Sequence, residues 1–139
     1  MAPAGDPSAG AGLFTDRDYQ AVNDFYASRP ELAPTPTRRL DHLARALGLG
    51  QLVAKDETAR FGLNAFKLLG ARFAVETLIA RGVIRPGATL ACASEGNHGR
   101  AVARAARDAG CAARVYMAAD AAEARASAIA REGAEVVRV

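Results

Sequence analysis

The chain has 139 residues, is 50% hydrophobic and 24% charged, and carries a formal net charge of +3, which is enough for one modest globular core. No apolar run approaches the roughly 18 residues that span a bilayer, and the arginines alternate with acidic residues, which argues against membrane and nucleic-acid partners. The two cysteines lack metal-ligand spacing, so we expect no metal. Residues 1–14 lack the basic start and apolar run of a signal peptide, which predicts a disordered tail and a cytoplasmic protein.

The first half of the chain is predicted to hold two amphipathic helices, a short strand and a longer third helix. Thr15 and Asp18 have the spacing of a capping box, Pro30 ends the first helix, and Pro34 and Pro36 then force an extended link. Asn64 is expected to cap the third helix, with Ala65 as its first residue. The predicted ranges are helices at 15–28 and 40–47, a strand at 52–55 and a helix at 65–81 that ends at Gly82.

The second half alternates strands and helices with short turns. Apolar strands are predicted at 88–93, 112–118 and 135–139, with a helix at 100–109 and another that runs from a capping box at Asp120 and Glu123 to Gly133. Short connections between such elements favour a parallel sheet with right-handed crossovers. The predicted fold class is therefore α/β, a parallel sheet with flanking helices.

Lysine is almost absent from this chain, which makes its two positions informative. Of the 18 lysines and arginines, only Lys55 and Lys67 are lysines, and both lie in the stretch 55–70. Arginine can replace lysine as a generic cation but cannot become a nucleophilic amine. Lys67 falls in the predicted first turn of the third helix and is the candidate nucleophile. The alternative interpretation is an ordinary surface lysine.

A glycine-rich turn at 94–99 follows a predicted strand, at the edge where open parallel sheets bind ligands. Gly96 and Gly99 let the backbone approach a ligand closely. Asn97 can hydrogen-bond to a planar polar group, and Glu95 can act as an acid or a base. This turn is the second candidate site.

Two other interpretations of this turn are open. It can be a plain strand-to-helix turn with a polar cap. It can also be a dinucleotide fingerprint, with Gly96 and Gly99 as its last two glycines and Asp120 as the ribose-binding acid. That fingerprint has Ser94 in place of its first glycine and leaves Lys67 unexplained, so it ranks second.

Together the two stretches, with Lys67 and Asn97 separated by 30 positions, resemble fold-type II pyridoxal-phosphate enzymes of the tryptophan synthase β-like fold. Within that superfamily the chain looks most like the diaminopropionate ammonia-lyases. The Asn-Ala before Phe-Lys supports this, because threonine dehydratases usually carry Ser there. The resemblance covers roughly residues 15–139 and is carried by Pro34-Thr35-Pro36, Lys55-Asp56-Glu57, Arg60 to Lys67, and Gly96-Asn97-His98-Gly99-Arg100.

The resemblance implies a set of cofactor-binding residues. Lys67 would hold pyridoxal 5'-phosphate covalently and later act as the base at the α-carbon of the substrate. Asn97 would lie beside the phenolic oxygen of the cofactor, with Gly96 and Gly99 in the same turn. Phe66 would pack near the cofactor ring.

The implied activity is that of a carbon–nitrogen lyase, which eliminates ammonia from 2,3-diaminopropionate or a similar β-substituted amino acid to give pyruvate and ammonia. Glu95 stands where these enzymes carry Asp, and it would be the second acid–base group or protonate the leaving amine. The alternatives are a threonine or serine dehydratase-like lyase, an NAD(P)-binding Rossmann oxidoreductase and a non-catalytic remnant.

The resemblance also predicts domains and partners. Residues 15–85 match the N-terminal part of the large cofactor domain, with its lysine loop and helix, and residues 86–139 match a βαβαβ part of the small domain. The glycine-rich phosphate loop and the pyridine-nitrogen partner come later in the family, so we expect an N-terminal part that is inactive as an isolated chain. The complete enzyme is expected to be a homodimer that binds a small amino-acid substrate.

Overall fold

The computed structural model describes residues 14–139, which fall into two compact units that divide between Pro34 and Thr35. In the first unit, α1 (Asp16–Ala27) is followed by a 3-10 helix at Pro30–Leu32. The predicted capping box is confirmed: the Asp18 carboxylate accepts from the Thr15 N–H at 2.8 Å, and the Thr15 hydroxyl oxygen accepts from the Asp18 N–H. The predicted disordered tail lies outside the described residues, except for Phe14.

The second unit begins with a two-stranded antiparallel sheet. β1 (Thr37–Arg39) pairs with β2 (Val53–Lys55), and the helix α2 (Asp41–Ala46) connects them. The sequence predicted α2 and β2 but only an extended link at β1. A three-residue strand with every side chain exposed carries no apolar alternation, so only its pairing with β2 defines it.

The helix α3 (Lys67–Ala80) begins later than predicted. The expectation that Asn64 caps it and that Ala65 is its first residue is wrong. Asn64 has a left-handed backbone (φ 54°), and Phe66 occupies the N-cap position without a side-chain hydrogen bond. Leu63 and Ala65 both bury their side chains, and residues two positions apart do not share a face of a helix, which agrees with a turn at 63–66.

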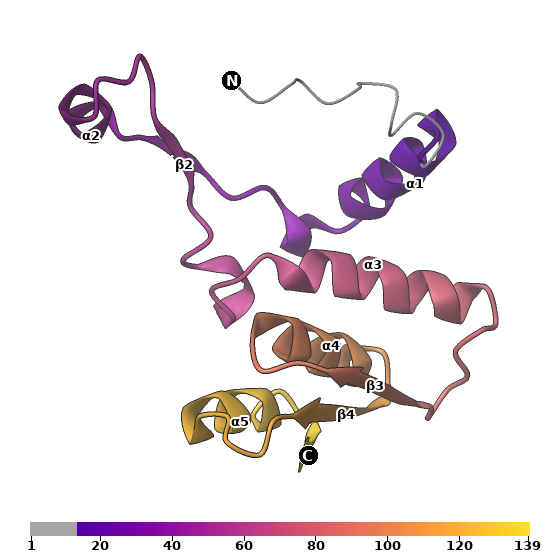
Figure 1. Ribbon diagram of the computed structural model, residues 1–139. Coiled ribbons are helices and arrows are strands. Elements are labelled where there is room, and N and C mark those ends of the chain that lie inside the picture. The colour runs from indigo at the N-terminus through magenta and orange to yellow at the C-terminus, as the bar shows by residue number, and fades with distance from the viewer. Residues whose placement is uncertain (1–13) are drawn as a thin grey trace, which may run out of the picture. The chain divides into compact units, whose positions relative to one another are not determined.

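Three parallel strands form the sheet of the second half, in the order β3 (Thr89–Ala93), β4 (Ala112–Met117) and β5 (Glu135–Arg138). The crossovers are α4 (Asn97–Asp108) and α5 (Glu123–Ala130), so the predicted α/β class is confirmed (Figure 1). α4 begins three residues earlier than expected. The predicted capping box of α5 does not form, because Ala122 occupies the N-cap and no side chain bonds there.

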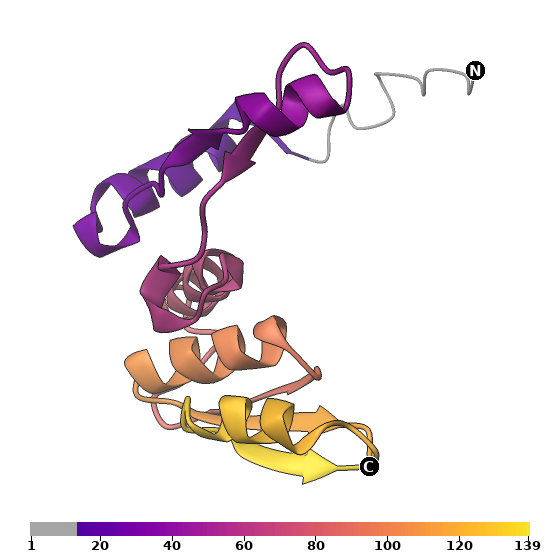
Figure 2. The same ribbon diagram turned by 90° about the vertical axis from the view of Figure 1, so that its left-hand side faces the viewer.

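α4 lies between α3 and the sheet, as Figure 2 shows. Ala103 and Ala106 pack with buried residues of β4 and α5, and Ala101 and Ala105 pack with buried residues of α3. All four alanines are at most 2% exposed. Small side chains on both faces let the helix approach its two neighbours closely. Along residues 14–139, no helix is both long enough and apolar enough to cross a membrane.

Gly99, in the first turn of α4, lies so close to its neighbours that a side chain there would require them to shift. A Cβ there would lie 3.0 Å from Val115 Cγ1 and 3.2 Å from Ile129 Cδ1. We expect Gly99→Ala to lower the free energy of unfolding by about 1–2 kcal/mol, because overpacking outweighs the gain in helix propensity. Urea denaturation measures this change.

The matched control is Gly70→Ala in α3, where an added Cβ meets no atom within 4 Å. This variant should gain about 0.5–1 kcal/mol from helix propensity alone. If both variants unfold at the same or a higher urea concentration than the unaltered chain, the close contact at Gly99 is not a constraint.

Candidate active site

Lys67 presents a free amine at the start of α3. Its side chain is exposed, and within residues 14–139 no carboxylate lies within ion-pair distance of it. The Nζ atom lies 4.3 Å from the centroid of the Phe66 ring, and Phe66 is itself 55% exposed. The amine thus lies over the Phe66 ring as in a cation–π contact, and both side chains are accessible to a ligand.

Lys55, in contrast, is engaged in the surrounding structure. Its ammonium donates a hydrogen bond to the backbone carbonyl of Thr35 and lies near the Glu57 carboxylate. Hydrogen bonds from Arg60 first and Thr35 second lower the pKa of Glu57. The neighbouring Asp56 has its pKa lowered to about 2, mainly by hydrogen bonds from Thr58 and then from Arg38. The stretch 55–57 therefore holds the loop in place.

The loop between β2 and α3 is anchored by a buried arginine. Arg60 is only 5% exposed, and its guanidinium donates to the Glu57 carboxylate and, at 2.9 Å, to the Thr35 hydroxyl. Its backbone carbonyl accepts from the N–H groups of Leu63 and Asn64 at 3.0 and 3.1 Å. Phe61 (φ 57°) and Asn64 (φ 54°) are both left-handed, which costs a non-glycine residue free energy. The two strained residues thus stand six and three positions before Lys67.

The second stretch forms a fixed turn at the carboxyl end of β3. The Ser94 hydroxyl oxygen accepts hydrogen bonds from the N–H groups of Gly96 and Gly99, at 3.3 and 2.9 Å. Gly96 is the N-cap of α4, and Asn97 is its exposed first residue. Asn97 therefore lies at the positive end of the helix dipole, at the sheet edge where ligands bind in such folds.

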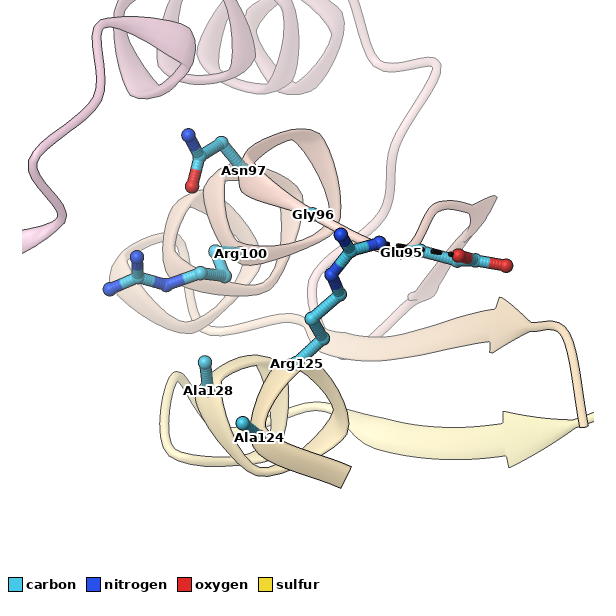
Figure 3. A pocket seen from close by; sticks show the side chains of 7 residues that line it. All are labelled: Glu95, Gly96, Asn97, Arg100, Ala124, Arg125 and Ala128. Atoms are coloured by element: carbon cyan, nitrogen blue, oxygen red, sulfur yellow. Dashed lines mark ion pairs between the residues drawn. The ribbon is translucent and has the colours of Figure 1, made fainter. Parts of the chain in front are cut away.

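A cavity of about 620 Å³ opens beside this turn, and its volume is typical of small-molecule sites. The Glu95 carboxylate lies 3.6 Å from the Arg125 guanidinium (Figure 3); Glu95 is half-buried and Arg125 is exposed. Glu95 also lines a second hollow of about 450 Å³ over the ends of β3 and β4. The lining of the first cavity is Glu95, Gly96, Asn97, Arg100, Ala124, Arg125 and Ala128.

The predicted site residues thus fall into two groups. Glu95, Gly96 and Asn97 line the cavity, whereas Gly99 is buried beneath the turn. Phe66 and Lys67 lie at the start of α3 and do not line it. A hydrogen bond from α4 to the loop before Lys67 joins the two groups: Arg100 Nη1 donates to the Leu63 carbonyl at 2.9 Å.

The sequence reasoning assigned no role to Arg125 or to the Arg100 side chain. Arg125 belongs to α5, and only the packing of α5 beside α4 brings it to Glu95. For Arg100 a signal existed, since it follows Asn97 by three residues and so shares its helix face.

The residues present fit pyridoxal phosphate. A free primary amine beside an aromatic face suits its aldehyde and planar ring, and an amide side chain with a helix N-terminus suits its polar substituents.

Comparison with known proteins gives consistent matches. Diaminopropionate ammonia-lyase of Escherichia coli (strain K12) is 35% identical over 140 residues, which cover 90% of this chain and 35% of that protein. The corresponding enzyme of Salmonella typhimurium is 38% identical over 131 residues, which cover 80% and 32%. This chain therefore spans about a third of the length of these relatives.

A solved structure of the E. coli enzyme in complex with D-serine superposes with a TM-score of 0.81 at 34% identity, over 93% of this chain and 37% of that one. The family described as pyridoxal-phosphate dependent enzyme matches residues 29–139. The resemblance inferred from the two motifs is confirmed, and this chain belongs to the pyridoxal-phosphate dependent enzyme family.

Proposed function

We propose that this chain supplies the reactive lysine and the asparagine turn of an ammonia-lyase, which eliminates ammonia from 2,3-diaminopropionate or a similar β-substituted amino acid. The observation that carries the proposal is the amine of Lys67, which begins α3 and has no ionic partner among the residues that the structure describes. Because the chain spans about a third of its relatives, the activity is proposed for the whole protein. The same proposal includes a domain boundary between residues 85 and 86, and a homodimer as the state of the whole protein.

Each named residue has a distinct task. When bound, pyridoxal phosphate supplies an electron sink for negative charge at the substrate α-carbon. Lys67 would hold the cofactor through Nζ, and its amine would accept the α-proton of the substrate. Phe66, whose ring centroid lies 4.3 Å from that Nζ, would lie beside the bound cofactor. Asn97 donates its amide to a polar ring substituent, and Gly96 keeps the backbone close.

Glu95 is proposed to handle a second proton. Its carboxylate stands at the edge of two hollows, where it can reach a bound substrate. The Arg125 guanidinium lies 3.6 Å from that carboxylate and orients it. In that role Glu95 accepts the α-proton of one substrate enantiomer, or delivers a proton to the departing β-amino group as ammonia forms.

Three other functions rank below this one. A dehydratase-like lyase would use the same lysine with a β-hydroxyl leaving group, and the two named relatives favour the β-amino group. Membership in the family favours pyridoxal phosphate over a nicotinamide cofactor. A non-catalytic remnant would have no need for the strained loop that precedes Lys67.

The first experiment asks which lysine carries the cofactor. The whole protein is incubated with pyridoxal phosphate, reduced with borohydride, and mapped by peptide mass spectrometry. We expect the pyridoxyl label on Lys67, because the Lys55 ammonium is already bonded to the Thr35 carbonyl. Lys67→Arg, which keeps the charge but cannot form the bond, should remain unlabelled at residue 67. A label confined to Lys55 would overturn the assignment.

The second experiment tests Glu95. Glu95→Gln in the whole protein should keep the visible absorbance of bound cofactor but lose about 10²–10⁴-fold in elimination rate for at least one enantiomer of 2,3-diaminopropionate. Pyruvate release measures the rate. Glu135→Gln is the control, because Glu135 is an exposed carboxylate on β5 paired with Arg114 at 2.7 Å. Unchanged rates for both enantiomers in Glu95→Gln would make it a bystander.

The third experiment uses the 139-residue chain by itself, which we expect neither to bind the cofactor tightly nor to release pyruvate. Phe66, Lys67 and Asn97 are all exposed, so a ring between them would remain in water. Much of the affinity for such a cofactor comes from its phosphate, which needs a backbone nest or helix N-terminus of its own. Absorbance titration and a pyruvate assay, each compared with Lys67→Ala, check this. Lys67-dependent turnover by this chain would contradict the expectation.

A further inference from the structure

Arg100 is the residue of α4 that hydrogen-bonds to the loop between β2 and α3, which directly precedes Lys67. It lies one helical turn after Asn97, and its Nη1 donates to the Leu63 carbonyl at 2.9 Å, across 37 positions in the sequence. Leu63 stands four residues before Lys67. A charged donor on a backbone carbonyl makes one of the stronger hydrogen bonds. One side chain thus bonds the loop of the reactive amine to the helix that begins with Asn97.

The guanidinium of Arg100 is also held from its other side. Nη2 lies 3.5 Å from Glu132, a carboxylate that is only 8% exposed at the end of α5. Glu132 also receives Arg104 at 3.4 Å and Arg107 at 3.7 Å, so three successive arginines of α4 share it. A buried carboxylate that anchors one edge of a planar guanidinium orients the opposite edge. Glu132 therefore orients the guanidinium of Arg100 toward the loop that precedes Lys67.

The third nitrogen of the Arg100 guanidinium, Nε, shows that this placement has a cost in stability. Arg100 Nε is buried and has no hydrogen-bond partner among the described residues. An unsatisfied buried donor destabilises the fold. Arg100 keeps this geometry nevertheless, with one Nη atom on Glu132 and the other on Leu63.

The loop at Leu63 depends on such a bond. The Leu63 side chain is 2% exposed and packs with Leu68 and Ala101, in the cluster between α3 and α4. The next residue, Asn64, is left-handed, so the chain reverses there before it reaches Lys67. A strained reversal needs contacts that over-determine it.

We propose that Arg100 is a positioning residue, which fixes the loop that carries Lys67 against the turn that carries Asn97 and so sets the spacing of the two groups. The functional part of this inference rests on the proposed function, since the spacing matters for a ligand that both groups contact. The positioning itself can be measured without any ligand.

Hydrogen–deuterium exchange of the 139-residue chain tests the positioning. In Arg100→Met, the amides of peptides that cover residues 61–69 should exchange about tenfold faster, because one charge-assisted hydrogen bond is lost. Arg104→Met is the matched control, since Arg104 shares the Glu132 carboxylate but does not reach the loop. It should leave the loop unchanged. Equal effects of both variants, or none, would overturn the proposal.

A second variant covers the case in which Arg100→Met does not fold. Arg100→Lys keeps the charge but cannot bond two partners as a planar fork. In this variant the loop amides should exchange faster than in the unaltered chain but by less than tenfold. The exchange rates of the β4 amides should not change. Loop exchange identical to that of the unaltered chain would show that the two-sided bonding of Arg100 is unimportant.

Trapping of pyridoxal phosphate by borohydride in the whole protein provides the functional readout. Arg100→Met should lower the fraction of Lys67 that carries the label, and Arg104→Met should not. An unchanged fraction in Arg100→Met would confine the residue to a structural role and overturn the functional part. If the unaltered protein carries no label on Lys67 while the exchange results hold, the proposed function fails and the positioning stands.

Discussion

The close packing of α4 on two neighbours at once is the constraint on which the rest of the structure depends. Alanines on opposite faces of this helix contact the sheet on one side and α3 on the other. At its start, Gly99 approaches Val115 and Ile129 so closely that an added methyl group would make tighter contacts than side chains usually have. The turn with Asn97 and the helix with Lys67 are therefore positioned by the same element, although 30 residues separate them in the chain.

The sheet and its helices could be predicted from the sequence because their signals are local. Apolar runs bounded by glycines predicted β3, β4 and β5, and the alternation with helices predicted their parallel order. The start of α3 could not be predicted in this way. Asn64 is a good N-cap by type, but its backbone is left-handed, and the neighbouring Leu63 is buried in a cluster with Ala101 and Ala105 of α4. Tertiary packing overrode local propensity.

The candidate site likewise contains residues with a local sequence signal and residues that only tertiary packing brings there. Lys67 and Asn97 were named from residue type and spacing, because a rare lysine and a glycine-rich turn are visible in one dimension. The partners of the site are not. Arg125 reaches Glu95 only because α5 lies beside α4, and Arg100 bonds to the carbonyl of Leu63, a group that every residue has. Because every residue has a backbone carbonyl, the residue type does not predict which carbonyl accepts such a hydrogen bond.

The near-absence of lysine has a structural counterpart. Arginine takes the positions that need several bonds from one side chain: Arg60 bonds to Glu57 and Thr35, and Arg100 joins Leu63 to Glu132. A planar guanidinium with five donors suits such junctions, and an ammonium does not. Within residues 14–139 the ion pairs of the loop are made by arginine, and none involves the amine of Lys67. This part of the chain therefore uses arginine for structural support and keeps the amine proposed to react apart from the groups that hold the loop.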